Sequence, residues 1–327
     1  MSKSTRVLGA SLGALALTVS LAACGGDTLE KSKDGGSSAP AASGGAKGKL
    51  VIGAAGFTES NVLAELYSQL LRQAGYSPSI TTVSNRELYE PSLEKGEIDV
   101  VPEYAATLAE FLNAKVNGKD APKDKPVASS DVTATVAALD KLATPLGIKA
   151  LPVGQAVDQN AFAVSKEFAE KNKLKTLSDL GKSGLKVKIA AGDECSVRPF
   201  CSPGLEKTYG IQVSGIDPKG VGTPQAKQAV KDGVDQLVLT TTTDATLDSF
   251  GLVLLDDDKK LQNADNILPV VNAKDAGSPE IEAALGGLTK VLTTADLVDL
   301  NRKVDAERAK PADVAKAYLE AKGLLTK

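Results

Sequence analysis

The sequence of 327 residues contains no histidine and no tryptophan. Without an imidazole, the chain cannot carry a Ser-His-Asp or Cys-His nucleophile pair, an HExxH zinc site or any other histidine-dependent site. An aromatic ligand box has to be built from the 6 tyrosines and 6 phenylalanines. The 38 basic and 41 acidic residues are interspersed, so we expect no surface for nucleic acid. These absences exclude many enzyme classes but do not favour any particular function.

The chain begins with the features of a bacterial signal peptide. Lys3 and Arg6 precede an apolar stretch, residues 7–19, which is too short to cross a hydrocarbon core about 30 Å thick. Small residues then lead into Cys24, and the run Leu21-Ala22-Ala23-Cys24 resembles a bacterial lipobox, in which the cysteine is lipidated. An ordinary secretory signal with an incidental cysteine is the alternative. We predict a lipoprotein signal peptide over residues 1–23.

Residues 24–47 are rich in glycine, serine and alanine, which predicts a flexible tether to the membrane. The remaining cysteines, Cys195 and Cys201, bracket a short loop. Because the space outside the membrane permits disulfides, we expect them to be bonded. A reactive thiol pair or a metal site is the weaker alternative, since two thiolates without histidine make a poor zinc site.

The body of the chain alternates between strand-like and helix-like apolar spacing, and its length suggests two domains. Short apolar runs predict strands over residues 49–54, 79–83, 98–101, 161–164, 187–191, 237–239 and 252–255. One-face spacing predicts a helix that Thr58 caps and Gly75 ends, and further helices over residues 86–95, 131–146 (capped by Ser130), 223–231, 278–292, 295–308 and 311–324. This alternation favours an α/β fold with parallel strands.

A series of short segments spans most of the body. They are Val51-Ile52-Gly53, Gly56-Phe57-Thr58-Glu59-Ser60, Leu93-Glu94-Lys95-Gly96-Glu97-Ile98-Asp99-Val100, Pro102-Glu103-Tyr104, residues 174–180, residues 203–210, Thr243-Asp244, residues 255–259 and Leu268-Pro269-Val270-Val271. In order and spacing they resemble the glycine betaine/choline/carnitine/proline-type (ProX/OpuC-type) substrate-binding lipoproteins of ABC transporters.

The resemblance implies an α/β, two-lobed periplasmic-binding-protein clamshell of type II, with two strand crossovers at the hinge. The crossovers are expected near Tyr104 and near Thr241–Asp244. Lobe one would then be residues 48–103 plus 245–327, and lobe two residues 104–244. Ligand would bind between the lobes, and hinge closure would present the closed form to the permease.

Family members that bind quaternary amines hold the cation in a cage of aromatic rings. Tyr104 stands at the family's Glu-Tyr position and Tyr89 near a family aromatic position, whereas Thr241 replaces a family aromatic residue. The Cys195–Cys201 loop replaces the usual acidic turn and aromatic residue, so the cage looks incomplete. We expect ligand contacts from Tyr104, Tyr89, Thr58, Glu59, Asp158, Gln159, Asn160, Arg198, Thr241, Thr243 and Asp244.

These candidates have structural alternatives: helix packing for Tyr89, a helix cap for Thr58 and Glu59, and a solvated surface position for Arg198. The resemblance implies a monomeric, non-enzymatic receptor, lipid-anchored to the outer face of the bacterial cell membrane, that delivers an osmoprotectant-type solute to ABC permease and ATPase subunits. No cofactor and no metal are expected. The alternatives are a receptor for another neutral polar or aromatic solute, a sensor or interaction protein, and a hydrolase using Glu59, Glu103 and Asp244.

Overall fold

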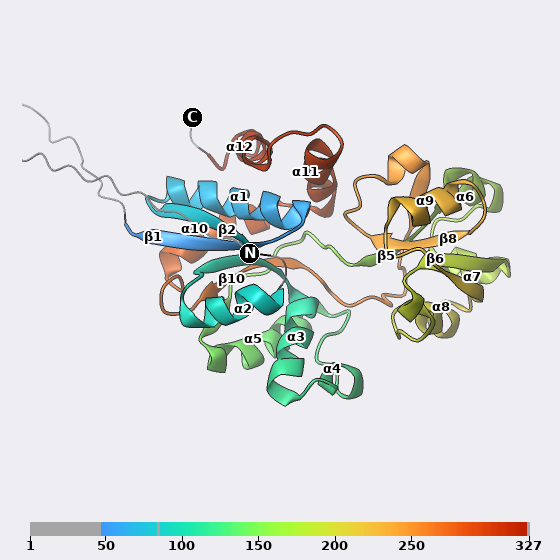
Figure 1. The fold of residues 1–327 in the computed structure, drawn as a ribbon, viewed down its shortest axis with the longest axis horizontal. Coiled ribbons are helices and arrows are strands. Elements are labelled where there is room, and N and C mark those ends of the chain that lie inside the picture. Colours follow the sequence, from blue (N-terminus) through green and yellow to red (C-terminus); the bar gives the residue numbers. More distant parts are fainter. Residues whose placement is uncertain (1–46, 84–85, 326–327) are drawn as a thin grey trace, which may run out of the picture. The chain divides into compact units, whose positions relative to one another are not determined.

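The computed structural model describes residues 47–83 and 86–325, and Figure 1 shows their arrangement. The predicted signal peptide, the lipidation site Cys24 and nearly all of the predicted tether lie outside the described residues. The described chain contains two five-stranded sheets with helices on their faces. None of the helices in this part of the chain combines the length and the hydrophobicity needed to cross a membrane.

The first sheet has the strand order β2-β1-β3-β10-β4. The first three strands run parallel, and β10 runs antiparallel to both of its neighbours. The strands are β1 (Lys49–Ala55), β2 (Ser77–Val83), β3 (Val100–Tyr104), β4 (Ile148–Ala150) and β10 (Ile267–Asn272). Their helices are α1 (Thr58–Gln73), α2 (Arg86–Lys95), α3 (Ala105–Asn117), α4 (Ala121–Asp124), α5 (Val132–Ala143), α10 (Pro279–Val291), α11 (Thr294–Asp305) and α12 (Pro311–Ala321), with a short 3₁₀ turn η1 (Thr144–Leu146).

Successive strand residues point to opposite faces, and each face has its own apolar core. Val100 of β3 packs with α1, α10, α11 and α12, whereas the next residue, Val101, packs with α2, α3 and α5. Helix α1 follows its apolar spacing, with Val62, Leu63 and Leu66 fully buried. Burial on both faces explains why these strands read as continuous apolar runs.

The second sheet has the order β7-β6-β8-β5-β9, and β5 is its antiparallel strand. It contains β5 (Asn160–Ser165), β6 (Lys186–Ala191), β7 (Gln212–Pro218), β8 (Leu237–Thr241) and β9 (Leu252–Leu255). Helices α7 (Leu177–Ser183) and α8 (Ser202–Tyr209) pack on one face with the core residues of α6 (Lys166–Asn172), and α9 (Pro224–Lys231) and the 3₁₀ turn η3 (Leu247–Phe250) pack on the other. In the first sheet the antiparallel strand β10 lies between β3 and β4, and in the second sheet the antiparallel strand β5 lies between β8 and β9.

The two sheets define two lobes whose boundaries differ from those predicted. Residues 105–150 were assigned to lobe two, but α3 and α5 cover the first sheet and β4 pairs with β10. Residues 245–255 were assigned to lobe one, but β9 pairs with β5. Tyr104 is therefore followed by a helix that returns to its own sheet, and Asp244 by a turn that leads to another strand of the second sheet. We use first lobe for residues 47–83, 86–150 and 267–325, and second lobe for residues 160–255.

The chain passes between the lobes in residues 151–159 and 256–266, which we call the crossing segments. They run side by side, since Val157 and Asn266 form an antiparallel bridge. The backbone N–H of Asp158 donates to the carbonyl of Asp265 at 3.1 Å, and the pairing continues into β10, where the N–H of Ile267 donates to the carbonyl of Ala156 at 2.9 Å. The hinge is thus a paired ribbon, which fixes the positions of the side chains that it carries.

Two of the predicted helix caps are wrong. Helix α1 has Phe57 as its N-cap residue, without a side-chain cap, and the Thr58 hydroxyl donates to Asp305 at 2.6 Å instead. Helix α5 is capped by Asp131, not Ser130, because the Asp131 carboxylate accepts from the N–H groups of Thr133 and Ala134. A carboxylate caps as well as a hydroxyl, and sequence alone does not choose between neighbouring candidates.

Candidate functional site

The first lobe, the second lobe and the crossing segments line a cleft with two adjoining compartments, each of about 400 Å³. Phe57, Asp158 and Thr241 line both. We call the first the aromatic compartment; it is also lined by Tyr104, Ala106, Thr107, Glu110, Gln159, Asn160, Phe200, Gln262, Asn263 and Asp265. We call the second the polar compartment; it is also lined by Thr58, Glu59, Val221, Gly222, Lys227, Thr240, Thr243, Asp244, Ala245, Thr246, Asn301 and Asp305.

The cleft lies at the ends of strands. Phe57 and Thr58 follow β1, Tyr104 ends β3, and Thr241 ends β8. In open α/β sheets, the carboxyl ends of the strands are where ligands bind, because the loops there converge and the buried strands fix their positions.

Two aromatic rings form one wall of the aromatic compartment. The centroids of Phe57 and Tyr104 lie 6.3 Å apart with a 30° tilt between the planes. Phe57 is 45% exposed although it is a large apolar residue, so its ring is available to a ligand. The second lobe contributes Phe200, which is 37% exposed. Carboxylates of Glu110, Asp158 and Asp265 also line this compartment, and no lysine or arginine is among its described lining residues.

The carboxylates of the aromatic compartment are held in place by hydrogen bonds. Asp265 accepts from both the backbone N–H (2.9 Å) and the hydroxyl of Thr107. Glu110 accepts from the backbone N–H groups of Val127 and Ala128, both at 2.7 Å. Burial raises the pKa of Asp265 to about 6, so this carboxyl is mostly ionised at neutral pH. The compartment therefore combines π faces with fixed negative charge.

Glu59 lines the polar compartment and is 4% exposed. The Tyr104 hydroxyl donates to its Oε1 at 2.8 Å, and the Asn301 amide donates to its Oε2 at 2.8 Å. Burial, together with the nearby Asp158 carboxylate, raises the pKa of Glu59 to about 7. Burial likewise raises the pKa of Asp158, against hydrogen bonding from Thr243 and Thr241. Glu59 belongs to the first lobe and Asp158 to a crossing segment, so the two carboxyl groups meet where the first lobe adjoins the hinge.

The polar compartment contains one ammonium group among its described lining residues, that of Lys227. Its side chain is only 6% exposed, and its Nζ lies 2.8 Å from Oδ2 of Asp244. The same Nζ donates to the Thr246 hydroxyl at 2.6 Å, while the Thr240 hydroxyl donates to Asp244 at 2.5 Å. The charge of Lys227 is thus neutralised inside the lobe.

Comparison with known proteins assigns a family to this arrangement. The family model described as the substrate binding domain of ABC-type glycine betaine transport systems matches residues 48–321. The chain belongs to this family. It is therefore the small-solute receptor of an ABC transport system, and such receptors act outside the cytoplasm.

Two curated relatives cover most of this receptor. The glycine-betaine-binding protein of Pseudomonas aeruginosa is 27% identical over 286 residues, which are 84% of this chain and 88% of that protein. The glycine betaine-binding protein YehZ of Escherichia coli is 26% identical over 277 residues, with 81% and 88% covered.

Solved structures confirm the predicted fold class. Apo YehZ from Escherichia coli matches with a TM-score of 0.71 at 24% identity, over 85% of this chain and 99% of that one. A protein titled glycine betaine/carnitine/choline ABC transporter also gives a TM-score of 0.71, at 20% identity, over 84% and 98%. The receptor has the two-lobed α/β architecture of type II periplasmic binding proteins.

Most of the predicted ligand contacts meet in this cleft. Those that line it are Tyr104, Thr58, Glu59, Asp158, Gln159, Asn160, Thr241, Thr243 and Asp244. Tyr89 does not: it is 5% exposed within the core of the first lobe, and its hydroxyl donates to Glu103. Arg198 is exposed on the disulfide loop and lines neither compartment. The acids of the hydrolase alternative are not brought together, since Glu103 is buried against Arg86.

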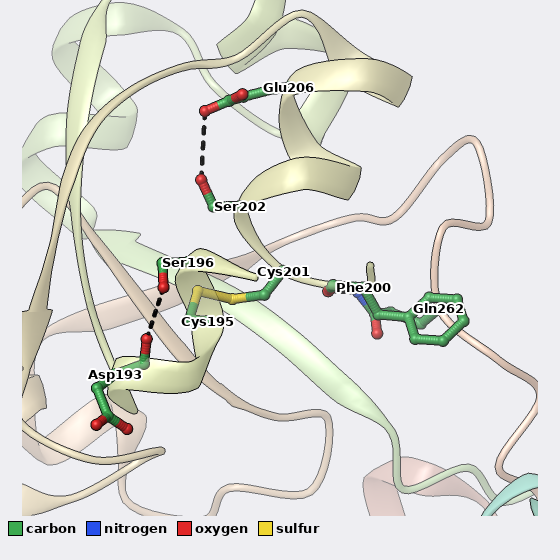
Figure 2. The surroundings of a disulfide bond; sticks show 8 residues. All are labelled: Asp193, Cys195, Ser196, Phe200, Cys201, Ser202, Glu206 and Gln262. Atoms are coloured by element: carbon green, nitrogen blue, oxygen red, sulfur yellow. Dashed lines mark hydrogen bonds between the residues drawn. A yellow bond between two sulfur atoms is a disulfide. The ribbon is translucent and has the colours of Figure 1, made fainter. Parts of the chain in front are cut away.

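Sequence reasoning missed several lining residues, of which the aromatic ones matter most. Phe57 stood in a recognised motif but received no role. Phe200 stands beside Cys201 in the Cys195–Cys201 loop (Figure 2). This loop was expected to replace a family aromatic residue, but its Phe200 lines the aromatic compartment. The other polar residues that were missed come from segments well separated in the chain: Thr107, Glu110, Lys227, Thr240, Thr246, Gln262, Asn263, Asp265, Asn301 and Asp305.

The predicted Cys195–Cys201 disulfide is confirmed. Both cysteines are buried in the core of the second lobe, at 1% and 3% exposure. Phe200 precedes Cys201, and its carbonyl accepts from the Gln262 side chain at 2.9 Å (Figure 2). The disulfide therefore anchors the loop that carries the third ring of the cleft.

We expect the double substitution Cys195→Ser and Cys201→Ser to lower the free energy of unfolding by about 2 kcal/mol. The bond closes a short loop, with a sequence separation of 6, and constrains the unfolded chain accordingly. Urea unfolding of the double variant and of the wild-type receptor measures the difference. Reduction of the wild-type protein should reproduce the loss and leave the variant unchanged; equal urea midpoints for all samples would contradict this role.

Proposed function

We propose that this receptor binds a small solute with a quaternary ammonium group and delivers it to ABC permease and ATPase subunits. The observation that carries the proposal is the wall of Phe57 and Tyr104 next to the carboxylates of Asp158 and Asp265, with no cationic side chain among the described residues of that compartment. A ring face attracts a cation by about 0.5–2 kcal/mol, more where water is excluded. Fixed carboxylates add Coulomb attraction without requiring a donor from the ligand.

The names of the relatives support the same chemistry. Two are glycine-betaine-binding proteins, and another, from Listeria monocytogenes, is a carnitine transport binding protein that matches 49% of this chain. All of these names refer to solutes with a quaternary nitrogen. The neutral-solute alternative is less favoured, because a neutral solute would bring no positive charge to the carboxylates of the aromatic compartment.

The proposal includes how the receptor works in the cell. We infer a monomer without a catalytic step, held at the outer face of the cell membrane by a lipid on Cys24. The lipobox and the tether composition of residues 24–47 support the anchor. Labelling with a radioactive fatty acid tests it: the wild-type protein should incorporate label, and Cys24→Ala should not.

Isothermal titration calorimetry of the full chain tests the ligand class. Choline, glycine betaine and carnitine are the probes, with proline and neutral sugars for comparison. We expect at least one quaternary amine to bind with micromolar affinity or better and the sugars to give no heat of binding. Binding of a neutral solute in the absence of any quaternary amine signal would overturn the proposal in favour of the alternative ligand class.

The affinity for choline is expected to rise up to tenfold between pH 6 and pH 8. Choline keeps its charge over this range, whereas Glu59 has a pKa of about 7. Below pH 7 the Glu59 carboxyl is mostly neutral and the cleft holds less negative charge; above it the carboxylate is ionised and favours the cation, so protons compete with the ligand. Calorimetry at several pH values measures the slope.

The matched variant is Glu59→Gln, which cannot ionise. At every pH this variant should bind choline about as weakly as the wild-type receptor does at pH 6. Its affinity should change with pH less than that of the wild type, because only Asp158 and Asp265 still titrate. A slope as steep in Glu59→Gln as in the wild-type receptor would show that other groups are responsible.

A further inference from the structure

The first crossing segment changes its bonding partners from the first lobe to the second over a single residue. On the first-lobe side, the N–H of Val157 donates to the hydroxyl of Thr294 in α11 at 2.9 Å. On the other side, the carbonyl of Gln159 accepts from the N–H of Thr242, a residue of the second lobe, at 2.9 Å. The chain is therefore held by the first lobe up to Val157 and by the second lobe from Gln159, with Asp158 between them.

The second crossing segment changes partners in the same way. The side-chain amide of Gln262 donates to the carbonyl of Phe200 in the second lobe at 2.9 Å. The N–H of Ala264 donates to the carbonyl of Ser129 in the first lobe at 2.8 Å. Asn263 stands between these two bonds. We call Asn263 and its counterpart in the first crossing segment the pivots, because rotation of one lobe against the other has to be taken up by backbone dihedral angles at such positions.

One hydroxyl group bridges the first pivot. Oγ1 of Thr242 accepts from the N–H of Gln159 at 3.1 Å and donates to the carbonyl of Val157 at 2.9 Å. Because Val157 precedes the pivot and Gln159 follows it, rotation at Asp158 moves the two partners of this hydroxyl relative to each other. Thr242 itself is a lining residue of neither compartment. A substitution of Thr242 therefore alters the hinge without removing a contact from the cleft.

The lobes stand apart in this arrangement. Phe57 of the first lobe and Phe200 of the second line the same compartment, yet they are 45% and 37% exposed. A small-molecule site buries about 70–90% of its ligand, so the lobes have to approach further before the two rings enclose one. The hydrogen bond between Thr242 and Val157 thus belongs to the open arrangement of the receptor.

We propose that Thr242 is a positioning residue of the hinge, whose hydroxyl holds the lobes open through Val157 and thereby lowers the apparent affinity of the receptor. Closure rotates the backbone at the pivots and separates this hydroxyl from the Val157 carbonyl, so the free energy of the bond favours the open form. A ligand that needs the closed form is weakened in proportion to the fraction of receptor in that form.

The effect of Thr242 does not depend on which solute the receptor carries. Its hydroxyl acts on the equilibrium between the open and closed forms and not on the bound ligand. Every ligand that requires closure is therefore weakened by the same factor, and the ratio of two affinities is left unchanged. A residue that contacts the ligand would instead change this ratio, which separates the two roles by experiment.

Calorimetry of the full-chain variant Thr242→Val tests this inference, with choline and glycine betaine as probes. Valine has the shape of threonine without the hydroxyl. We expect both ligands to bind about threefold to tenfold more tightly than to the wild-type receptor, with the ratio of their affinities unchanged, as the loss of one hydrogen bond from the open form predicts. Thr242→Ser keeps a hydroxyl and should return the affinity to within twofold of wild type. Unchanged or weaker binding by Thr242→Val, or an altered ratio, would overturn the inference.

The matched control is Thr294→Val. The hydroxyl of Thr294 also bonds to Val157, accepting from its N–H at 2.9 Å and donating to its carbonyl at 3.3 Å, but both residues lie on the first-lobe side of the pivot. This variant should keep both affinities within twofold of wild type. A rise as large as that of Thr242→Val would overturn the inference, since loosening Val157 from either side would then suffice. Thr242→Ala carries the same expectation as Thr242→Val and replaces it if the valine variant does not fold.

A measurement without ligand keeps the inference separate from the proposed function. If neither probe binds the wild-type receptor, the proposed function fails, but the equilibrium between the lobes can still be measured. Spin labels at Lys219→Cys and Ala306→Cys, in a chain that also carries Cys24→Ala, report the distance between the lobes; each site lies within two residues of a lining residue of the polar compartment. We expect a larger population at short distances in Thr242→Val than with threonine at this position, and equal distance distributions would overturn the inference.

Discussion

Replacing Tyr104 with alanine is expected to weaken the binding of choline about thirtyfold. Two contributions are lost together: the ring beside Phe57, and the hydroxyl that donates to Glu59 at 2.8 Å. A cation–π contact contributes about 0.5–2 kcal/mol and a hydrogen bond to a charged group about 1.5–3 kcal/mol, part of which is felt by the bound ligand. A net loss of about 2 kcal/mol corresponds to the expected factor. Calorimetric titration of wild type and variant measures it.

Two further substitutions separate the ring from the hydroxyl. Tyr104→Phe keeps the ring and should weaken choline binding only about threefold, through the altered Glu59. Tyr76→Ala is the matched control, because Tyr76 also donates to a glutamate, Glu280, at 3.1 Å but lines neither compartment. It should leave the affinity unchanged. An affinity for Tyr104→Ala within twofold of wild type would show that this ring is not part of the ligand site.

The secondary structure was predictable where a single physical pattern dominates. Helix α2 has the predicted bounds, residues 86–95, and β9 has the predicted bounds, residues 252–255. Strand β10 was missed as a strand, although its motif was noted, because it follows a polar crossing segment and contains Pro269. Pairing partners far away in sequence, here β3 and β4, decide that this run is a strand.

The crossover positions were not predictable from the family motifs. The resemblance implied that the chain leaves its sheet near Tyr104, at the end of β3, and near Thr241–Asp244, at the end of β8. Whether a strand end leads to a helix of the same lobe or to the other lobe depends on later contacts, such as those of α5 with the first sheet. The crossing segments have no periodic pattern, since they pair partly with each other, at Val157 and Asn266, and partly with the lobes, as where Leu151 donates to Pro269 of β10.

The residues of the cleft likewise include some that the sequence predicted and some that it did not. The family resemblance pointed to Tyr104, Asp158 and Thr241, and all three line the cleft. Phe200, Lys227 and Asn301 were missed, since each sits on a loop or helix whose approach to the cleft is set by tertiary packing. Tyr89 was wrongly placed in the site because a tyrosine near an expected cage has the same sequence signature whether it contacts ligand or core.

The position of Tyr104 depends on a buried ion pair beside it. Arg86 donates to both oxygens of Glu103, at 2.7 and 2.6 Å, and Glu103 is 0% exposed. The same carboxylate accepts from the Tyr89 hydroxyl and from the backbone N–H of Tyr104 at 3.0 Å. One carboxylate thus fixes the end of β3 at the point where the chain enters the cleft, and its charge is balanced by one guanidinium group.

Arg86→Met is accordingly expected to lower the free energy of unfolding by about 3–5 kcal/mol. The substitution keeps much of the side-chain volume but leaves Glu103 as an uncompensated buried charge, and the cost of breaking such a pair from one side is much larger than the net value of the pair. Urea unfolding measures the loss. The double variant Arg86→Met with Glu103→Gln should recover a large part of it, since the charge is then gone. The control is Lys303→Met, which breaks a pair with Asp299 that is 40% and 46% exposed and should cost less than about 1 kcal/mol. A loss for Arg86→Met as small as that of the control would show that the pair does not hold the end of β3, and the rigidity assigned to Tyr104 would need another source.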